Sequence, residues 1–545
     1  MASFEENEPM DIEQHASDEE TEPFEAIPEE QMFDDEDEDG NFDPMQIQWS
    51  DEPIEQRRRP AHNVLRHAEG LTSYSRGIQS PIEAFRLFFT RQIVQIILHH
   101  TNKRLQESNR DEIHPTEFDA FIGLLIAMGV TKQNKVELKD LWNVGSLYHM
   151  PIFTGTMARN RFEEILYKMR FDDKSTRVTR SANDRLAALR EVTDLLRDAC
   201  HKAYIPSSNV TVDERMTPFR GNCRFRVYMK SKPHKYGIKS WVLADARNNY
   251  VKDFLIYLGK QNNQRERNQS MNVVLKLSEH LEQGRNITTD NFFTSFELAN
   301  RLKSKKLTLL GTVRKTRKGI PPELKVANKP LFASTFKYSS LGTCVSYQCK
   351  VNKCVILFSS EDHTGEISSE ENEFKPEIIL KYNFNKGGVD NLDRKTGDFT
   401  VQRITQRWTV ALFLSYVDIM LNNAHEIWKK SSLERATSEK KDFLKQLVED
   451  LIRNQVENRM ALGFSGVQSE VQSSIMHVSK CLNIQGSQPQ EEASTSTDDR
   501  QRCAICITKK KQTRVRCSLC KKPACPDHST REKTVICTIC KEKQN

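Results

Sequence analysis

The chain has 545 residues and a formal net charge of +6, and a chain of this length usually folds as two or more domains. Residues 1–56 contain 22 Asp and Glu and no Lys or Arg, so the remainder carries +28. A basic surplus of this size indicates a nucleic-acid partner. The acidic start has no apolar core of a signal peptide, and no run of 18 apolar residues follows, which argues against secretion and against a membrane span. We expect a soluble, intracellular protein.

The N-terminal part divides into a polar tail and a helical region. Residues 1–60 are acidic, interrupted by prolines and poor in apolar periodicity, which predicts a disordered tail. Ser80 and Pro81 are typical of a helix start, and apolar residues at helical spacing follow them. This pattern predicts a helical region from about residue 78 to about residue 205.

From residue 209 the apolar pattern changes to alternation, beginning with Val210 and Val212. Two strand-like runs, 238–243 and 254–258, flank Asn248 and Asn249, which predicts a hairpin. Further strand-like runs end at Thr289 and Val313, and helical periodicity returns over 292–302, 389–392 and 408–456. Residues 465–500 are rich in Ser, Gln and acidic side chains and predict a linker.

Three acidic residues lie at the ends of predicted elements. Asp213 and Asp290 follow short strands, and Asp390 follows two glycines at a helix start. Phosphoryl transfer by two Mg²⁺ ions needs carboxylates that converge from separate elements. With 75 acidic residues in the chain, a trio chosen by spacing alone is more often a set of loop caps and solvated charges.

Seven of the 13 cysteines fall between Cys503 and Cys540. With one histidine they form four pairs, each with a two-residue spacer: Cys503 and Cys506, Cys517 and Cys520, Cys525 and His528, Cys537 and Cys540. Eight such ligands satisfy two tetrahedral Zn²⁺ ions, with the first and third pairs opposite the second and fourth in an interleaved, cross-brace arrangement.

The charge and ligand order of this cysteine module bear on its partner. A RING ubiquitin-ligase module usually carries its histidine earlier in the ligand order. Residues 501–545 hold 12 Lys and Arg against three acidic residues, which favours DNA as the partner. A reader of histone or other protein segments is the alternative. The lysines at 509–511 form a weak nuclear-import signal.

Four blocks of sequence resemble those of piggyBac-type transposases in order and spacing. They are VDERMTPFRGNCRFR at 212–226 with KPHKYGIK at 232–239, TTDNFFTS at 288–295, GTVRKTRKGIP at 311–321, and NKGGVDNLD at 385–393. The resemblance extends from about residue 80 to residue 540. The final ligand pattern, with a lone histidine closing the third pair, is also similar to that family's terminal domain.

The resemblance implies a multidomain α+β fold, in which an RNase H-like α/β catalytic domain is embedded in a helical dimerisation and DNA-binding domain. The helical domain would comprise 61–208 and 400–464, the catalytic domain 209–315 and 379–399, and a β-rich insertion 316–378. A linker, 465–500, would precede the zinc module, 501–545. Asp213, Asp290 and Asp390 would form the catalytic triad, on the first strand, the fourth strand and a later helix. Asp393 would be a fourth ligand of Mg²⁺ or Mn²⁺.

The resemblance also implies an activity and its partners. A nuclear homodimer would bind the terminal inverted repeats of a transposon, excise it through hairpin intermediates and integrate it at TTAA. Seven residues would contact DNA: Arg314, Lys315, Arg317, Lys318, Arg403, Arg407 and Trp408. The alternative for the basic run at 314–318 is a solvated loop, and the alternative for Trp408 is a place in the protein core. A domesticated relative that binds DNA without cutting it is the alternative function.

Overall fold

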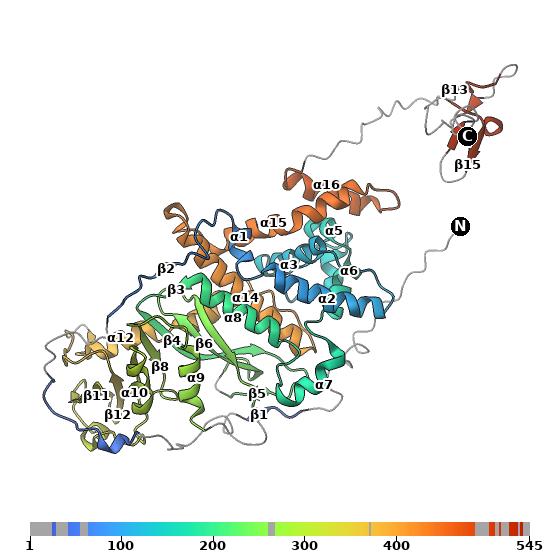
Figure 1. The fold of residues 1–545 in the computed structure, drawn as a ribbon. Helices are drawn as coiled ribbons and strands as arrows, with labels where there is room; N and C mark the ends of the chain where they lie inside the picture. The colour runs from blue at the N-terminus through green and yellow to red at the C-terminus, as the bar shows by residue number, and fades with distance from the viewer. Residues whose placement is uncertain are drawn as a thin grey trace. The chain divides into compact units, whose positions relative to one another are not determined.

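The computed structural model describes residues 24–28, 42–54, 64–230, 232–259, 267–326, 328–369 and 372–484, and, nearer the C-terminus, 501–506, 512–513, 523–531 and 535–537. The chain divides into two compact units, Met1–Ile484 and Gln485–Asn545. Figure 1 shows a mixed sheet and many helices in the larger unit. Among the described helices, none is long and apolar enough to cross a membrane.

Helices dominate the N-terminal part of the larger unit. The hydroxyl of Ser80 accepts a hydrogen bond from the backbone of Glu83, so the predicted helix start at Ser80 and Pro81 is confirmed. The helices are α1 (Pro81–Arg86), α2 (Arg91–Glu107), α3 (Pro115–Val130), α4 (Leu138–Trp142), α5 (Pro151–Thr156), α6 (Arg159–Lys168), α7 (Lys174–Asn183) and α8 (Arg190–Ala203). A short ladder joins β2 (Gly70–Leu71) to β3 (Tyr204–Ile205).

The centre of the sheet is an antiparallel meander that continues into parallel strands. β4 (Asn209–Pro218) pairs with β6 (Tyr236–Asp245), which pairs with β7 (Val251–Ile256). On its other side β4 is parallel to β8 (Asn286–Thr289), and β8 is parallel to β9 (Thr308–Thr312). Asn249 adopts a φ of 64° between β6 and β7, a conformation that asparagine tolerates in turns. The predicted hairpin is therefore confirmed.

The remaining helices pack around this sheet and on the N-terminal helices. They are α9 (Gln269–Leu277), α10 (Phe296–Ser304), α11 (Pro322–Lys325), α12 (Glu377–Asn385), α13 (Gly388–Gly397), α14 (Trp408–Lys430), α15 (Lys440–Ala461) and α16 (Ser469–Cys481), with 3₁₀ turns η3 (Pro44–Gln46) and η6 (Leu433–Arg435). α14 is buried from Trp408 to Trp428, as expected of a core helix. α15 contacts α3, and α16 contacts α5.

The predicted insertion, 316–378, does not stand apart from the catalytic sheet. Its strands β10 (Ser334–Tyr338), β11 (Thr343–Lys350) and β12 (Lys353–Ser359) form an antiparallel ladder. β12 then pairs with β9. The predicted insertion is therefore β-rich, and it extends the sheet through backbone hydrogen bonds to β9.

The prediction of a disordered tail over 1–60 is wrong for the two segments of it that the structure describes. β1 (Ile27–Pro28) pairs with β5 (Arg226–Tyr228), itself paired with β6. In the second segment, the indole of Trp49 packs edge-on against Phe296 at 5.6 Å. Apolar side chains within the acidic sequence thus find partners on the folded unit.

The predicted linker, 465–500, begins too early. α16 occupies Ser469–Cys481, and a Cβ at Gly155 of α5 would lie only 2.8 Å from the carbonyl oxygen of Ser474. This close backbone approach, together with buried Ile475 and Val478, makes α16 part of the larger unit. Its polar surface residues explain why composition suggested a linker.

The described part of the C-terminal unit consists of short elements. β13 (Gln501–Arg502) pairs with β14 (Gln512–Thr513), and β15 (Ser529–Arg531) pairs with β16 (Val535–Cys537). The 3₁₀ turn η7 (Pro526–His528) precedes β15. Ladders this short need additional cross-links to be stable.

Candidate active site and zinc-binding cluster

Asp213 and Asp290 lie at the same level of two neighbouring parallel strands. Val212 of β4 is in register with Thr289 of β8, and each aspartate directly follows one of these residues. Thr289 is in turn in register with Gly311 of β9. Asp290 thus follows the end of β8, whereas β4 continues past Asp213 to Pro218, which corrects the expectation that Asp213 follows a short strand. The two aspartates therefore lie beside each other on neighbouring strands.

Asp390 reaches this region from a helix that is fastened to β4. Thr211 donates a hydrogen bond from Oγ1 to the carbonyl of Asn385 at 2.7 Å, and a Cβ at Gly388 would lie 2.6 Å from the same Oγ1. Asn249 donates from Nδ2 to the carbonyl of Gly388 at 2.9 Å. These contacts hold the start of α13 beside the strand that carries Asp213.

Tyr382 of α12 is a neighbour of this group that sequence reasoning did not single out. Burial raises the pKa of its hydroxyl, a hydrogen bond with Thr312 opposes that shift, and the charges of all three aspartates add to it. The hydroxyl therefore lies within the field of the three carboxylates. The sequence feature that could have identified Tyr382 is its position three residues before the NKGGVDNLD block.

The electrostatics favour a cation between the acids. Burial, with a contribution from the charge of Asp290, raises the pKa of Asp213 to about 7. Burial also raises the pKa of Asp290. Desolvated carboxylates beside one another resist ionisation unless positive charge compensates them, and their oxygens are the ligands that Mg²⁺ prefers. The donor set therefore fits a divalent cation.

Two other carboxylates near the site are engaged by basic side chains. Glu214 pairs with Lys239 at 2.7 Å and with Lys232 at 3.4 Å. Asp393, expected as a fourth metal ligand, accepts a hydrogen bond from Arg215 Nε at 2.7 Å. The structure thus places Asp393 in an ion pair that joins α13 to β4.

The predicted basic DNA-contacting loop follows β9 at the edge of this site. Arg314 donates from Nε to Asn291 Oδ1 at 3.4 Å, and its charge opposes in part the burial that raises the pKa of Asp290. Lys315 and Lys318 are exposed, and Arg317 is half-buried. The loop closes at Gly319, whose φ is +83° and whose carbonyl accepts a hydrogen bond from Trp49.

Of the other predicted DNA contacts, Arg407 and Trp408 are buried and Arg403 is half-buried. Arg403 donates to the carbonyl of Asn134 at 2.9 Å, and Arg407, 8% exposed, donates to the carbonyl of Met169 at 2.5 Å. The ring of Trp408 is 6% exposed and packs edge-on against Phe225 at 5.0 Å. The structure therefore engages these three side chains in structural contacts and gives no support to their predicted DNA contacts.

The first and third ligand pairs of the cysteine module form one cluster. The ligand atoms of Cys503, Cys506, Cys525 and His528 all lie within 4.8 Å of one another. Cys506 and Cys525 sulfurs are 3.8 Å apart, and His528 Nδ1 is 3.5 Å from the Cys506 sulfur. A tetrahedral zinc shell has edges of about 3.8 Å between sulfurs and about 3.6 Å between sulfur and nitrogen. The cluster is therefore compatible with Zn²⁺.

The electrostatics at Cys503 favour a thiolate. Burial opposes its ionisation, but backbone hydrogen bonds from residues 525, 505 and 506 together lower its pKa to about 6. A thiolate is the form that binds zinc. The second predicted set lies outside the described side chains: Cys517, Cys520, Cys537 and Cys540.

Comparison with known proteins identifies the family to which the chain belongs. Residues 80–425, more than half of the chain, match the family model described as Transposase IS4. The human PiggyBac transposable element-derived protein 3 is 24% identical over 375 residues, which cover 65% of this chain and 62% of that protein. Human PiggyBac transposable element-derived protein 2 is 24% identical over 384 residues, or 66% of this chain and 63% of that protein.

A solved structure gives a longer match. The piggyBac transposase in a synaptic complex with hairpin DNA is 30% identical, with a TM-score of 0.72, over 87% of this chain and all of that chain. The chain therefore belongs to the piggyBac-type transposases. It spans about three fifths of the length of the two human relatives.

Proposed function

We propose that the protein is a DNA transposase that cuts and joins phosphodiesters with Asp213, Asp290 and Asp390 as its metal-binding triad. One observation carries this proposal. Two half-buried carboxylates follow residues in register on parallel strands, and a third lies on a helix that a hydrogen bond from Arg215 to Asp393 fastens to the first of these strands. The 30% identical structure of a piggyBac transposase with hairpin DNA supports the same reaction class.

The strand arrangement supports an RNase H-like catalytic domain. β4, β6, β7, β8 and β9 occur in this order along the chain, and the sheet places them as β7, β6, β4, β8 and β9. Asp213 is thus on the first of these strands, Asp290 follows the fourth, and Asp390 lies on a later helix. This matches the positions that the family resemblance implies for the three acids.

In the proposed phosphoryl transfer, metal ions and side chains of the protein have different roles. Two Mg²⁺ or Mn²⁺ ions, when bound, would activate the attacking oxygen and stabilise the leaving oxygen of an in-line displacement. The aspartates would hold these ions, and Arg314 would contact a phosphate beside them, where a guanidinium can bind two oxygens. Tyr382 offers a hydroxyl to the same space.

The wider activity follows from the family resemblance. We propose excision through hairpin intermediates and integration at TTAA, by a homodimer that brings two transposon ends together in the nucleus. The C-terminal module would bind terminal-repeat DNA through its basic surface and hold two Zn²⁺ ions in closed shells, which leave no position for a reacting water.

The test replaces each acid separately with its amide. Asp213→Asn, Asp290→Asn and Asp390→Asn should each abolish Mg²⁺-dependent nicking of a terminal-repeat duplex and leave binding of that duplex intact. Glu214→Gln is the matched control, because Glu214 is next to Asp213 but is paired with Lys239; it should retain cleavage. Nicking at the parental rate by any triad variant would remove that residue from the triad.

The alternative is a transposase-derived protein that binds DNA and has lost cutting. The names of the human relatives, which describe them as transposable element-derived, motivate it. Intact carboxylates at all three positions favour the active enzyme. Specific binding of terminal repeats without nicking, in either Mg²⁺ or Mn²⁺, would instead establish the alternative.

A further inference from the structure

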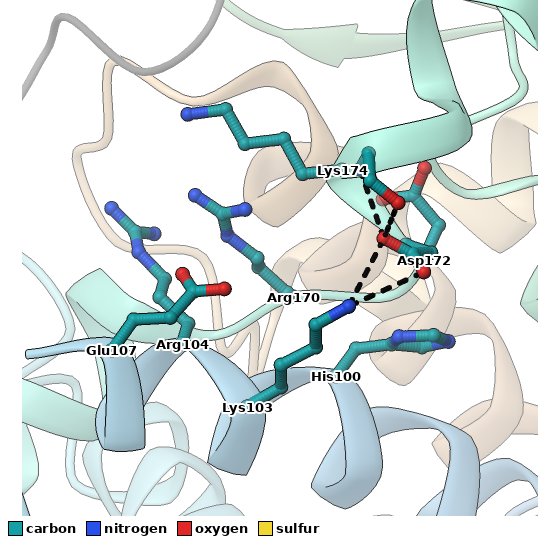
Figure 2. Close-up of a pocket in the computed structure, with 9 residues that line it drawn as sticks. His100, Lys103, Arg104, Glu107, Arg170, Asp172 and Lys174 are labelled. Atoms are coloured by element: carbon teal, nitrogen blue, oxygen red, sulfur yellow. Dashed lines mark hydrogen bonds and ion pairs between the residues drawn. The ribbon is translucent and has the colours of Figure 1, made fainter.

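A cationic cavity lies away from the carboxylate site, between α2 and the segment that joins α6 to α7. Its volume is about 380 Å³, and Figure 2 shows the side chains that line it. Four of the lining residues are basic: Lys103, Arg104, Arg170 and Lys174. None of them belongs to the sequence blocks that carry the family resemblance.

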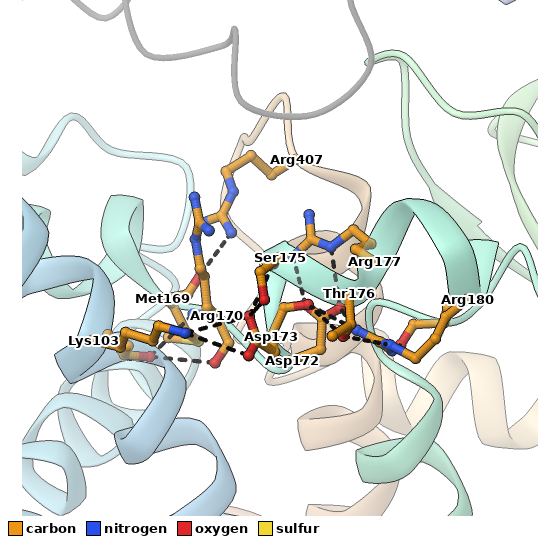
Figure 3. A network of polar contacts seen from close by, with 12 residues as sticks. Lys103, Met169, Arg170, Asp172, Asp173, Ser175, Thr176, Arg177, Arg180 and Arg407 are labelled. Atoms are coloured by element: carbon orange, nitrogen blue, oxygen red, sulfur yellow. Dashed lines mark hydrogen bonds and ion pairs between the residues drawn. The ribbon is translucent and has the colours of Figure 1, made fainter.

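Two of the three acidic residues of the cavity are engaged by basic partners. Asp172, whose side chain is 8% exposed, pairs with Arg177 and Arg180, each at 2.5 Å (Figure 3). Asp173 caps α7 through the backbone of Ser175 and pairs with Lys103 at 3.3 Å. The lining itself holds four basic and three acidic groups, the third acid being Glu107, and the two arginines that neutralise Asp172 lie outside the lining.

One of the basic groups is fixed by a contact of its own guanidinium. Arg104 donates from Nη1 to the carbonyl of Tyr167 at 3.0 Å. The main chain of Arg170 is anchored to α2, because its N–H donates to Thr101 Oγ1 at 3.0 Å and the Thr101 hydroxyl donates to its carbonyl. Figure 2 shows Arg104, Arg170 and Lys174 at the same cavity. A fixed cation binds an anion with little loss of side-chain freedom.

The cavity is connected to the strand that carries Asp213. Arg407 binds the carbonyls of Tyr167 and Met169, next to Arg170 (Figure 3). The preceding residue, Gln406, touches the loop that follows β4, where a Cβ at Gly221 would lie 2.7 Å from its carbonyl. Arg407 and Gln406 therefore join the segment that carries Arg170 to the loop that follows β4.

We propose that this cavity binds backbone phosphates of the DNA duplex that the enzyme cuts, on the stretch next to the reacting bond. The inference rests on the proposed function, since it takes DNA as the substrate. A duplex presents phosphates at regular spacing along each strand, so a duplex seated at the carboxylates can place a second group of phosphates over this cavity. Its contacts add affinity and orientation without reading sequence.

The test removes the two exposed lysines, because the buried arginines also support the fold. Lys103→Ala with Lys174→Ala should reduce the slope of log K against log salt by about two units for duplex binding. The matched control is Lys202→Ala with Lys445→Ala, which also removes two exposed lysines that each pair with an aspartate. The control should keep the parental slope, and Lys103→Arg with Lys174→Arg should restore it.

The outcomes separate this inference from the proposed function. Equal slopes for the test and control variants, in a protein that still binds and nicks DNA, would overturn the cavity site alone. Absence of duplex binding by the parent protein would overturn both. A thermal denaturation midpoint close to that of the parent shows that the double variant folds, and Lys174→Ala alone, with an expected change of about one unit, provides a milder second variant.

Discussion

Arg215 holds Asp393 through a hydrogen bond of 2.7 Å from its Nε atom. The same guanidinium bonds Ser415 of α14 at 2.6 Å and Thr396 of α13 at 3.2 Å. Arg215 is two residues after Asp213 on β4. One buried side chain thus ties the strand that carries Asp213 to the helix that carries Asp390.

We therefore expect Asp393→Asn to lower the nicking rate by roughly 10- to 100-fold, the usual effect of losing a group that orients a metal ligand. Asp390→Asn should abolish nicking under the same conditions. Asp398→Asn, on an exposed residue just after α13, is the control and should be neutral. Single-turnover nicking measures all three, and complete inactivity of Asp393→Asn would instead favour Asp393 as a metal ligand.

Trp49 anchors the second described N-terminal segment to the loop that carries Arg314. Its indole donates to the carbonyl of Gly319 at 3.0 Å and packs on Phe296. Since Trp49 is half-buried, Trp49→Ala should lower the free energy of unfolding by about 1–3 kcal/mol, less than for a fully buried tryptophan. It should also impair integration, because the loop loses a support.

Two variants control the Trp49 measurement. Trp49→Phe keeps the ring and loses the N–H, so it should fall between Trp49→Ala and the parent. Met45→Ala removes a side chain that is 70% exposed and should change neither stability nor integration. If Trp49→Ala matches Met45→Ala in urea denaturation, the segment does not stabilise the fold.

Arg314→Ala combined with Arg317→Ala should reduce integration more than excision. We expect this difference if the loop holds target phosphates, and the salt dependence of target binding should flatten by about one unit per lost contact. Lys325→Ala with Lys350→Ala removes two exposed lysines from the same region of the chain and serves as the control. Equal integration by the two double variants would make 314–318 a solvated loop.

Removal of zinc should affect recognition and spare the catalytic fold. Cys503→Ser with Cys525→Ser removes two thiolates from one cluster, so bound zinc should fall by at least one ion per chain and specific binding of terminal repeats should weaken sharply. Non-specific nicking at high protein concentration should persist. Cys481→Ser, an exposed cysteine outside the module, is the control.

Zinc content by elemental analysis and gel-shift with cognate and scrambled ends provide the readouts. Unchanged selectivity for the cognate end after loss of zinc would assign the module to a protein partner.

Local pattern predicted the elements that carry the candidate site. The alternation at Val210 and Val212 located β4, the two asparagines located the hairpin, and the cysteine spacers located the cluster at Cys503 and His528. Each of these signals lies within a few residues of the feature that it predicts.

Features that depend on distant partners were missed. Ile27–Pro28 is too short a strand to show periodicity, and its pairing with β5 depends on residues about 200 positions away. Trp408 stands in a motif rich in basic residues, which favoured a DNA contact, but Phe225 and the surrounding helices bury it. Burial of this kind depends on packing between elements, which no window of local sequence contains.

The contact between Trp49 and Gly319 also sets an order of events during synthesis. The ribosome makes the indole 270 residues before the carbonyl that it binds, an interval of roughly ten to fifty seconds at ordinary elongation rates. Until the sheet exists, the aromatic and apolar residues of 42–54 remain without their final partners, surrounded by acidic sequence that opposes association between chains. The segment therefore docks late, and in the finished protein it is among the parts that we expect to open first without global unfolding.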